Sequence, residues 1–253
     1  MNDFSNYYEQ LNPRQAQAVD AIDGPLLILA GPGTGKTQLL SVRAASILKK
    51  KRAEPENILI LTYTNAAVKA MKDRLYRIIG PSGYGVEVAT FHSFANSVIH
   101  DSEESADYIQ EKIQISDIEK VRAIEHILDN TKGLGEIRPF GAPYLYRREI
   151  LGSIRDLKNE GISPDGFTAF LKRYEPDGSY IQQKHMPRLS AFGEVYRRYE
   201  DLKSGRRPGV FDERGRYDYE DMIIIAGDAL KSEPLLRGRY AAQYTFIMVD
   251  EFQ

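Results

Sequence analysis

The chain has 253 residues, of which 42% are hydrophobic and 28% charged, and its net charge is −2. This length suffices for one large domain or two small ones with a buried core, which excludes a disordered chain and a disulfide-stapled miniprotein. Because cysteine is absent, disulfides, thiolate metal sites and cysteine nucleophiles are excluded. No apolar run approaches the ~20 residues of a membrane span, and residues 1–10 lack a signal-peptide core. We therefore expect a cytoplasmic protein without membrane contact.

The first part of the chain alternates strands with helices. Asn12 and Pro13 are typical of a helix start, and Gly24-Pro25 ends that helix. The sequence then predicts buried strands over 26–30, 58–62 and 86–90, with helices over 36–50 and 65–79 between them. This alternation indicates an α/β domain with a parallel sheet.

Residues 101–207 show helical periodicity and no clear strand. The candidate helices lie over 116–128, 143–160, 164–174 and 187–203. A Gly-, Arg- and Pro-rich segment, 204–215, is interpreted as a linker that leads back to a helix over 217–230 and a strand over 245–249. We therefore predict one α/β domain, 1–100 with 208–253, interrupted by an all-helical subdomain, 101–207.

Charge is uneven within the predicted insertion. Acidic residues outnumber basic ones from 101 to 136, and the balance reverses from 137 to 207. Interleaved aromatic and basic residues of this kind are compatible with a platform for single-stranded nucleic acid, or with an ordinary amphipathic helix surface. The residues concerned are Tyr144, Tyr146, Arg147, Arg148, Arg155, Lys158, Arg197, Arg198 and Tyr199.

A glycine-rich loop lies between the first predicted strand and the helix that follows it. We call this segment the phosphate loop; it comprises Ala30, Gly31, Pro32, Gly33, Thr34, Gly35, Lys36 and Thr37, and Gln38 follows it. Glycines let successive backbone N–H groups wrap a phosphate, and a helix N-terminus adds positive potential. In such a loop Lys36 would contact the β- and γ-phosphates, and the Thr37 hydroxyl would ligate Mg²⁺. Where the usual pattern opens with glycine this loop has Ala30, which requires only a negative φ there.

An acidic pair, Asp250 and Glu251, follows the last predicted strand. Parallel strands present their carboxyl ends to the ligand in sheets of this type. Asp250 is therefore a candidate to hold Mg²⁺, and Glu251 to orient and deprotonate an attacking water.

Six segments resemble, in order, motifs of the N-terminal part of UvrD/Rep/PcrA-type superfamily 1 helicases. The segments are 11–15, 30–37, 61–67, 89–95, 217–222 and 249–253, and residues 158–162 with Pro164 are similar to an element of the helical subdomain of that family. The resemblance implies a RecA-like P-loop NTPase domain that uses ATP and Mg²⁺. It also implies that the chain is the N-terminal piece of a longer protein whose second RecA-like domain lies beyond residue 253.

The resemblance further implies roles for residues outside the phosphate loop. Gln15 would recognise adenine, and Gln253 would contact the γ-phosphate beside the catalytic Lys36, Asp250 and Glu251. Single-stranded DNA would lie against Thr62, Tyr63, Asn65, Thr90, Phe91 and His92. The implied parent is a 3′-to-5′ DNA helicase or translocase that acts on a single strand or a single/double-strand junction in DNA repair, replication or recombination.

Two other classes of protein remain compatible with these residues. One is a P-loop ATPase of another class, against which Gln15 and the ending 250–253 argue. The other is a non-enzymatic DNA-binding module, against which an intact set of Lys36, Thr37, Asp250 and Glu251 argues. We expect this chain alone to be a monomer that binds ATP, hydrolyses it poorly and does not unwind DNA.

Overall fold

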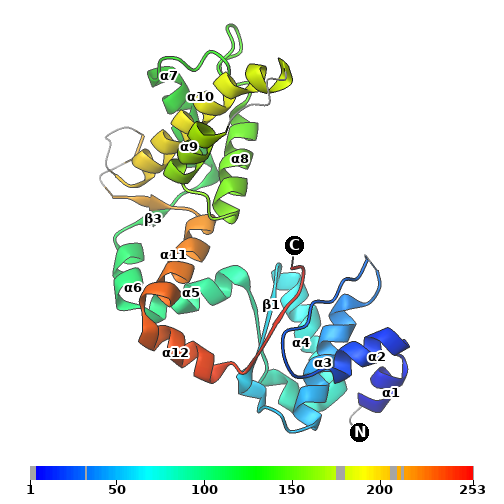
Figure 1. Ribbon diagram of the computed structural model, residues 1–253. Helices are drawn as coiled ribbons and strands as arrows, with labels where there is room; N and C mark the ends of the chain where they lie inside the picture. Colours follow the sequence, from blue (N-terminus) through cyan, green and yellow to red (C-terminus); the bar gives the residue numbers. More distant parts are fainter. Residues whose placement is uncertain (1–3, 32, 175–179, 206–209, 212–213, 253) are drawn as a thin grey trace. The chain divides into compact units, whose positions relative to one another are not determined.

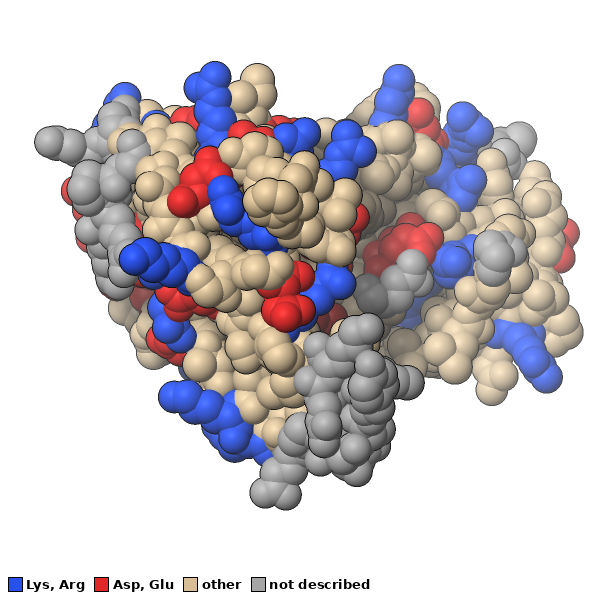
Figure 2. All heavy atoms as spheres, turned by 90° about the horizontal axis from the view of Figure 1, so that it is seen from above, with Lys and Arg blue, Asp and Glu red and all other residues tan. Residues whose placement is uncertain are grey.

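The computed structural model describes residues 4–31, 33–174, 180–205, 210–211 and 214–252, and of residues 180–184 it describes only the backbone. The chain divides into a first unit, Met1–Val98 with Ala229–Gln253, and a second unit, Ile99–Asp228. Lys and Arg are interspersed with Asp and Glu on the face that Figure 2 shows, which agrees with the small net charge of −2. Among the described residues, no helix has both the length and the apolar character to cross a bilayer.

A parallel sheet of strand order β2-β1-β5 lies at the centre of the first unit. Strand β1 spans Ile58–Thr62, β2 spans Glu87–Thr90 and β5 spans Phe246–Val249 (Figure 1). Thr62 pairs with Thr90, and Leu61 pairs with Val249. All three strands therefore end at the same edge of the sheet, and the predicted parallel α/β arrangement is confirmed.

The helices of the first unit begin and end close to the positions that the sequence predicts. Asn12 caps α2 in a reciprocal capping box with Gln15, and Gly80 ends α4. The elements are α1 (Phe4–Glu9), α2 (Pro13–Asp20), α3 (Lys36–Lys49), η1 (Pro55–Asn57), α4 (Asn65–Ile79), η2 (Gly80–Tyr84) and α12 (Pro234–Gln243), and α5 (Phe91–Asp101) begins here.

Strand β1 is buried on both faces. Ile58 and Ile60 contact the apolar side of α3 and α4, with Ile47 and Leu75. The alternate residues, Leu59 and Leu61, pack on the other face with Tyr244 and the partly buried Phe94 and Tyr240. This two-sided burial explains why the strand is a continuous apolar run rather than an alternating one.

The predicted strand over 26–30 is wrong: the segment has no strand pairing in the structure. Leu27 and Leu29 are 69% and 89% exposed, respectively. An apolar run becomes a strand only where a neighbouring strand offers it a ladder of hydrogen bonds, and no pairing given for β1, β2 or β5 includes this segment.

The second unit is mainly helical. Its core joins Ile124 and Leu128 on one helix to Ile150 and Ile154 on the next, and to aromatic residues such as Phe192. The elements are α6 (Glu103–Gln110), β3 (Ile113–Gln114), α7 (Asp117–Asn130), α8 (Arg147–Asn159), α9 (Pro164–Arg173), α10 (Tyr180–Lys203), β4 (Arg216–Tyr217) and the first part of α11 (Tyr219–Ser232).

Three features of the second unit differ from the prediction. Strands β3 and β4 pair in parallel, so the unit is not all-helical. This pairing also holds residues 216–217 in the second unit, which continues to Asp228, whereas the sequence places the return at 208. Helix α10 begins at Tyr180 and runs through Pro187, because a proline removes one hydrogen bond without always ending a helix.

Candidate functional site

The phosphate loop folds as a turn in which two of the three glycines adopt left-handed backbone angles. Gly33 has φ = 73° and Gly35 has φ = 84°, which side-chain-bearing residues rarely adopt. Thr34 closes the turn, because both its backbone N–H and its hydroxyl donate to the carbonyl oxygen of Gly31, at 3.4 and 2.8 Å. Ala30 is not among the residues with positive φ, which agrees with the expectation for that position. Pro32 lies outside the described residues.

The phosphate loop leads directly into the N-terminus of α3. Gly35 is the N-cap residue of this helix and has no side chain to cap it. The first backbone N–H groups of a helix have no intrahelical partner, so this end offers donors and positive potential to an anion. Lys36 and Thr37 open the helix, and Gln38 is half-buried in its first turn.

Gln15 connects α2 to the phosphate loop. Its side-chain Nε2 donates to the carbonyl oxygen of Thr34 at 3.0 Å, and its Oε1 accepts from the backbone N–H of Asn12 at 2.9 Å. A primary amide carries two N–H donors and two lone pairs, so one of each remains for a ligand. The structure thus gives Gln15 a role that the sequence did not predict, which is to hold the loop in place.

The acidic pair follows β5 directly. The Asp250 backbone N–H donates to the carbonyl oxygen of Leu61 at 2.8 Å and so extends the ladder between β5 and β1. The Asp250 side chain is almost buried, and its Oδ1 accepts from the Glu251 N–H at 3.2 Å. Burial, and then the charge of Glu251, raise the pKa of Asp250. Glu251 itself adopts φ = 55°. Gln253 lies outside the described residues.

The loop and the acidic pair lie together although they come from opposite ends of the chain. Lys36 Nζ is 3.9 Å from Glu251 Oε1, and the two side chains are 29% and 44% exposed, respectively. Both remain accessible to a ligand at this point. The Thr37 hydroxyl and the Asp250 carboxylate are hard oxygen donors of the kind that Mg²⁺ prefers, so the residues present fit this ion.

The residues expected to contact nucleic acid follow the neighbouring strands β1 and β2. Tyr63 is 72% exposed, and Asn65 begins α4 on the surface. Phe91 is partly buried against the cluster of Leu59 and Leu61, and His92 is half-buried.

The two threonines of this group face inward. Thr62 is buried at the end of β1, and the Thr90 hydroxyl accepts from the backbone N–H of Ser93 at 3.1 Å. The accessible part of this edge is therefore built around Tyr63 and Asn65.

Several of the aromatic and basic residues of the second unit are buried or engaged within the unit. Tyr199 is buried in the core, and the Tyr144 hydroxyl donates to Asp129 at 2.7 Å. Arg147 pairs with Glu125, and Arg198 pairs with Glu194. Ordinary helix packing and ion pairs therefore account for much of this pattern.

A buried ionic cluster joins two sequence elements whose contact the sequence did not predict. We call Lys158, Glu200, Lys203, Asp218 and Asp221 the lysine–carboxylate cluster. Lys158 Nζ lies 2.6 Å from Asp218 and 2.5 Å from Asp221, and Lys203 Nζ lies 2.8 and 2.6 Å from the same two residues. The acidic-aromatic segment 217–222 and the Lys158 element were both visible in the sequence. Only the fold shows that they bind each other.

The charges of the cluster stabilise one another. Burial alone would raise the pKa of Asp218, but Lys203 and Lys158 hold that pKa well below its ordinary value. Burial alone would likewise lower the pKa of Lys203, but Glu200, Asp221 and Asp218 raise it. The cluster ties α8, α10 and the start of α11 together within the second unit.

A parallel sheet, a glycine-rich turn at a helix N-terminus and an acidic pair at the end of a strand define a mixed α/β protein with a candidate ligand site at one edge of the sheet. Comparison with known proteins gives the family. The model of the UvrD/REP helicase N-terminal domain matches residues 11–253, and the chain belongs to this family.

Curated relatives agree with the family. The chain is 30% identical to the ATP-dependent DNA helicase PcrA of Bacillus subtilis, over 100% of this chain and 31% of the relative. It is 28% identical to DNA helicase II of Escherichia coli, over 99% of this chain and 31% of the relative. It is also 28% identical to DNA helicase II of Rickettsia typhi, over 98% of this chain and 34% of the relative. The chain thus spans about a third of the length of these relatives.

Proposed function

We propose that this chain is the ATP-binding part of an ATP-dependent DNA helicase that moves 3′ to 5′ on single-stranded DNA in repair, replication or recombination. One observation carries the proposal: Lys36 of the phosphate loop and Glu251 of the acidic pair lie 3.9 Å apart at the carboxyl edge of a parallel sheet. The names of the relatives, which are DNA helicases, support the choice of DNA as the polymer.

Each residue of the site has a task in this proposal. The N–H groups at the start of α3 and the Lys36 ammonium bind the triphosphate, while Thr37 and Asp250 hold Mg²⁺. Glu251 orients the attacking water and accepts its proton. Gln15 recognises adenine with its remaining donor and acceptor, and Gln253 contacts the γ-phosphate. Bound Mg²⁺ supplies charge neutralisation at the phosphates.

The neighbouring edge of the sheet binds the strand. Tyr63 is the principal base-stacking residue because its ring is 72% exposed, and one stack contributes about 1–3 kcal/mol. Phe91 and His92 line the same edge, and Asn65, Thr62 and Thr90 lie along it. ATP hydrolysis and movement would further require a second RecA-like domain of the same protein. The assembly is proposed to be monomeric and cytoplasmic.

Nucleotide binding tests the site directly. We expect the chain to bind a fluorescent ATP analogue in the presence of Mg²⁺, and Lys36→Ala to abolish this binding. Lys132→Ala, which removes an exposed lysine of the second unit, is the matched control and should leave affinity unchanged. Undiminished ATP affinity in Lys36→Ala would refute the phosphate-loop assignment.

Stimulation by DNA tests the remainder of the proposal. ATP hydrolysis by a longer protein that contains this chain should rise strongly with single-stranded DNA, and Tyr63→Ala should reduce the stimulation. Tyr84 is 68% exposed elsewhere in the first unit, so Tyr84→Ala is the matched control. Hydrolysis indifferent to DNA would indicate a P-loop ATPase of another class, and DNA binding without hydrolysis would indicate a non-enzymatic module.

A further inference from the structure

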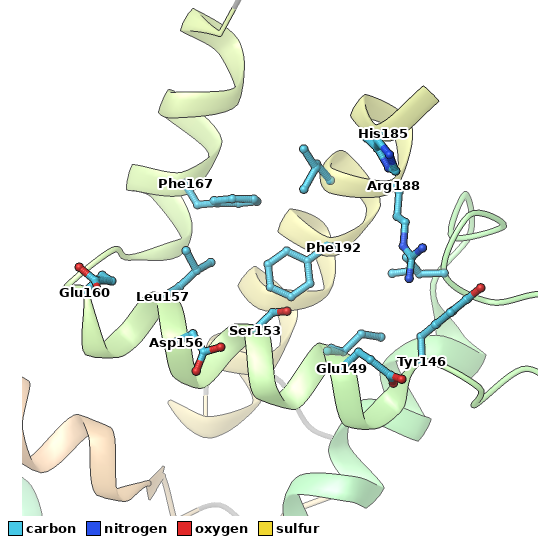
Figure 3. Close-up of a pocket in the computed structure, with 13 residues that line it drawn as sticks. Tyr146, Glu149, Ser153, Asp156, Leu157, Glu160, Phe167, His185, Arg188 and Phe192 are labelled. Atoms are coloured by element: carbon cyan, nitrogen blue, oxygen red, sulfur yellow. The ribbon is translucent and has the colours of Figure 1, made fainter. Parts of the chain in front are cut away.

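A pocket of about 620 Å³ opens on the second unit, and its lining includes none of the residues assigned to ATP or DNA in the proposed function. Its walls come from α8, α9 and α10, together with Ile137 and Tyr146. In Figure 3, Phe167 of α9 and Phe192 of α10 lie next to each other, with Leu157 and Ser153 of α8 below them in this view. Pockets of this volume commonly bind ligands.

The floor of the pocket is apolar and rigid. Phe167 and Phe192 are each only 9% exposed, and their rings meet edge to face with centroids 5.5 Å apart. Ile150 and Ile137 are buried beside them. Such a floor offers an apolar surface on which one aliphatic or aromatic side chain of a ligand can pack.

One rim of the pocket is acidic. Glu149, Ser153, Asp156 and Glu160 line it, and all four are exposed. They lie at helical spacings of four, three and four residues, so they form one stripe along α8, which we call the α8 acidic stripe.

Arg188, a cation that lines the pocket on α10, already stacks on an aromatic ring of the pocket wall. The Arg188 guanidinium lies over the Tyr146 ring, 4.3 Å from its centroid. Three carboxylates along one rim disfavour the approach of a phosphate backbone and favour a cationic ligand.

We propose that this pocket docks a basic amphipathic helix of a partner protein. One apolar side chain of that helix packs on the floor that Phe167 and Phe192 form together, and Lys or Arg residues on the flanking turns pair with the α8 acidic stripe. The helical spacing of the stripe matches a ligand whose cations also recur with helical spacing. This proposal does not depend on the function of the ATP site.

The experiment uses the 253-residue chain and synthetic probes. The probe is a fluorescent peptide of about 15 residues, long enough for a helix, with leucines on one face and lysines on the flanking positions. A second peptide has every lysine replaced by glutamate, and a fluorescent oligo-dT strand represents nucleic acid. Anisotropy should show that the basic peptide binds, that salt weakens the binding, and that the acidic peptide does not bind.

Three variants locate the binding. Ser153→Trp fills the pocket from an exposed position, and Glu149→Lys with Asp156→Lys reverses the charge of the α8 acidic stripe. Each change should lower the affinity for the basic peptide at least about tenfold. Asp107→Lys, which changes an exposed acid of α6, should leave affinity unchanged. Circular dichroism and thermal unfolding confirm that each variant folds. The proposal is overturned if the basic peptide fails to bind, if Ser153→Trp binds it as well as the parent chain does, or if oligo-dT binding is lost in Ser153→Trp.

Discussion

Asp250 directly follows strand β5 and is a buried residue, 5% exposed. Burial and the adjacent charge of Glu251 raise its pKa, so the folded chain binds this proton more tightly than the unfolded chain does. Ionisation of Asp250 therefore subtracts from stability at neutral pH. The loss fades as the pH falls from above the raised pKa to the ordinary value for an aspartate.

We accordingly expect Asp250→Asn to stabilise the nucleotide-free chain at about pH 7, by roughly 0.5–2 kcal/mol. Asparagine keeps an Oδ1 acceptor for the Glu251 N–H, which lies 3.2 Å away. Urea unfolding of both proteins measures the difference, which should shrink at about pH 4. A less stable Asp250→Asn at neutral pH would mean that the Lys36 charge outweighs the penalty of burial.

In the lysine–carboxylate cluster, in contrast to Asp250, lysine charges stabilise the buried carboxylates in their ionised form. Lys158 and Asp218 side chains are each 3% exposed and lie 2.6 Å apart. Removing one partner of a buried pair leaves a charge without compensation, so Lys158→Met should destabilise the chain by roughly 3–5 kcal/mol. Lys132→Met is the exposed control and should change stability by no more than about 0.5 kcal/mol.

The loss of stability expected in Lys158→Met should depend on pH in a defined direction. The depressed pKa of Asp218 stabilises the fold above the ordinary aspartate pKa, and the contribution disappears as the pH falls below that value. The difference between the parent chain and Lys158→Met should therefore narrow in acid when both are unfolded with urea. A difference that stays constant down to about pH 3 would show that packing, and not charge, carries the effect.

At the scale of elements, the segment 26–30 separates apolar character from burial. Leu29 is 89% exposed, whereas Leu59 in β1 is fully buried. Leu29→Ser should therefore change stability by less than about 0.5 kcal/mol, while Leu59→Ala should cost about 2–5 kcal/mol. Denaturant unfolding compares them. A large loss of stability in Leu29→Ser would contradict the exposure of Leu29 and would favour the buried strand that the sequence predicts.

The elements that sequence predicts well are those with local signals. Asn12 marks the start of α2, Gly80 marks the end of α4, and the run 58–61 is apolar, so adjacent residues indicate each boundary. Segment 26–30 is similarly apolar, but whether it pairs depends on a partner strand elsewhere in the chain. The hydrophobicity of a segment indicates that it can be buried, but it does not indicate which other segment lies beside it.

Pairings between residues that are far apart in the sequence are likewise not predictable from the local sequence. The two-residue strands β3 and β4 pair across about a hundred positions, and their sequences, Ile113-Gln114 and Arg216-Tyr217, carry no strand pattern. Within the candidate site, the glycine turn before α3 and the place of Asp250 directly after β5 follow from local sequence signals. The bond from Gln15 to Thr34 does not, because it depends on how α2 meets the loop.

For the whole molecule, the ATP site and the acidic pocket belong to different units. Every described residue assigned to the nucleotide or the strand lies in the first unit, while the pocket lies in the second. The two proposals can therefore fail separately: Lys36→Ala should leave the basic peptide bound, and Ser153→Trp should leave ATP bound. Loss of both ligands in either variant would indicate a folding defect and not a binding site.

The share of the relatives that the chain covers, 31–34%, leads to the last prediction. If a second RecA-like domain completes the site, it brings the arginine finger that stabilises the transferred phosphate, a contribution of about 10³–10⁵ in rate. This chain alone should then bind Mg-ATP and hydrolyse it slower by a factor in that range than a longer protein does. Single-turnover hydrolysis of both proteins at saturating ATP measures the ratio. Glu251→Gln is the control, because residual turnover that belongs to this site must fall when the proton acceptor is removed. Turnover by this chain that rivals the longer protein and persists in Glu251→Gln would show that the site needs neither the second domain nor Glu251.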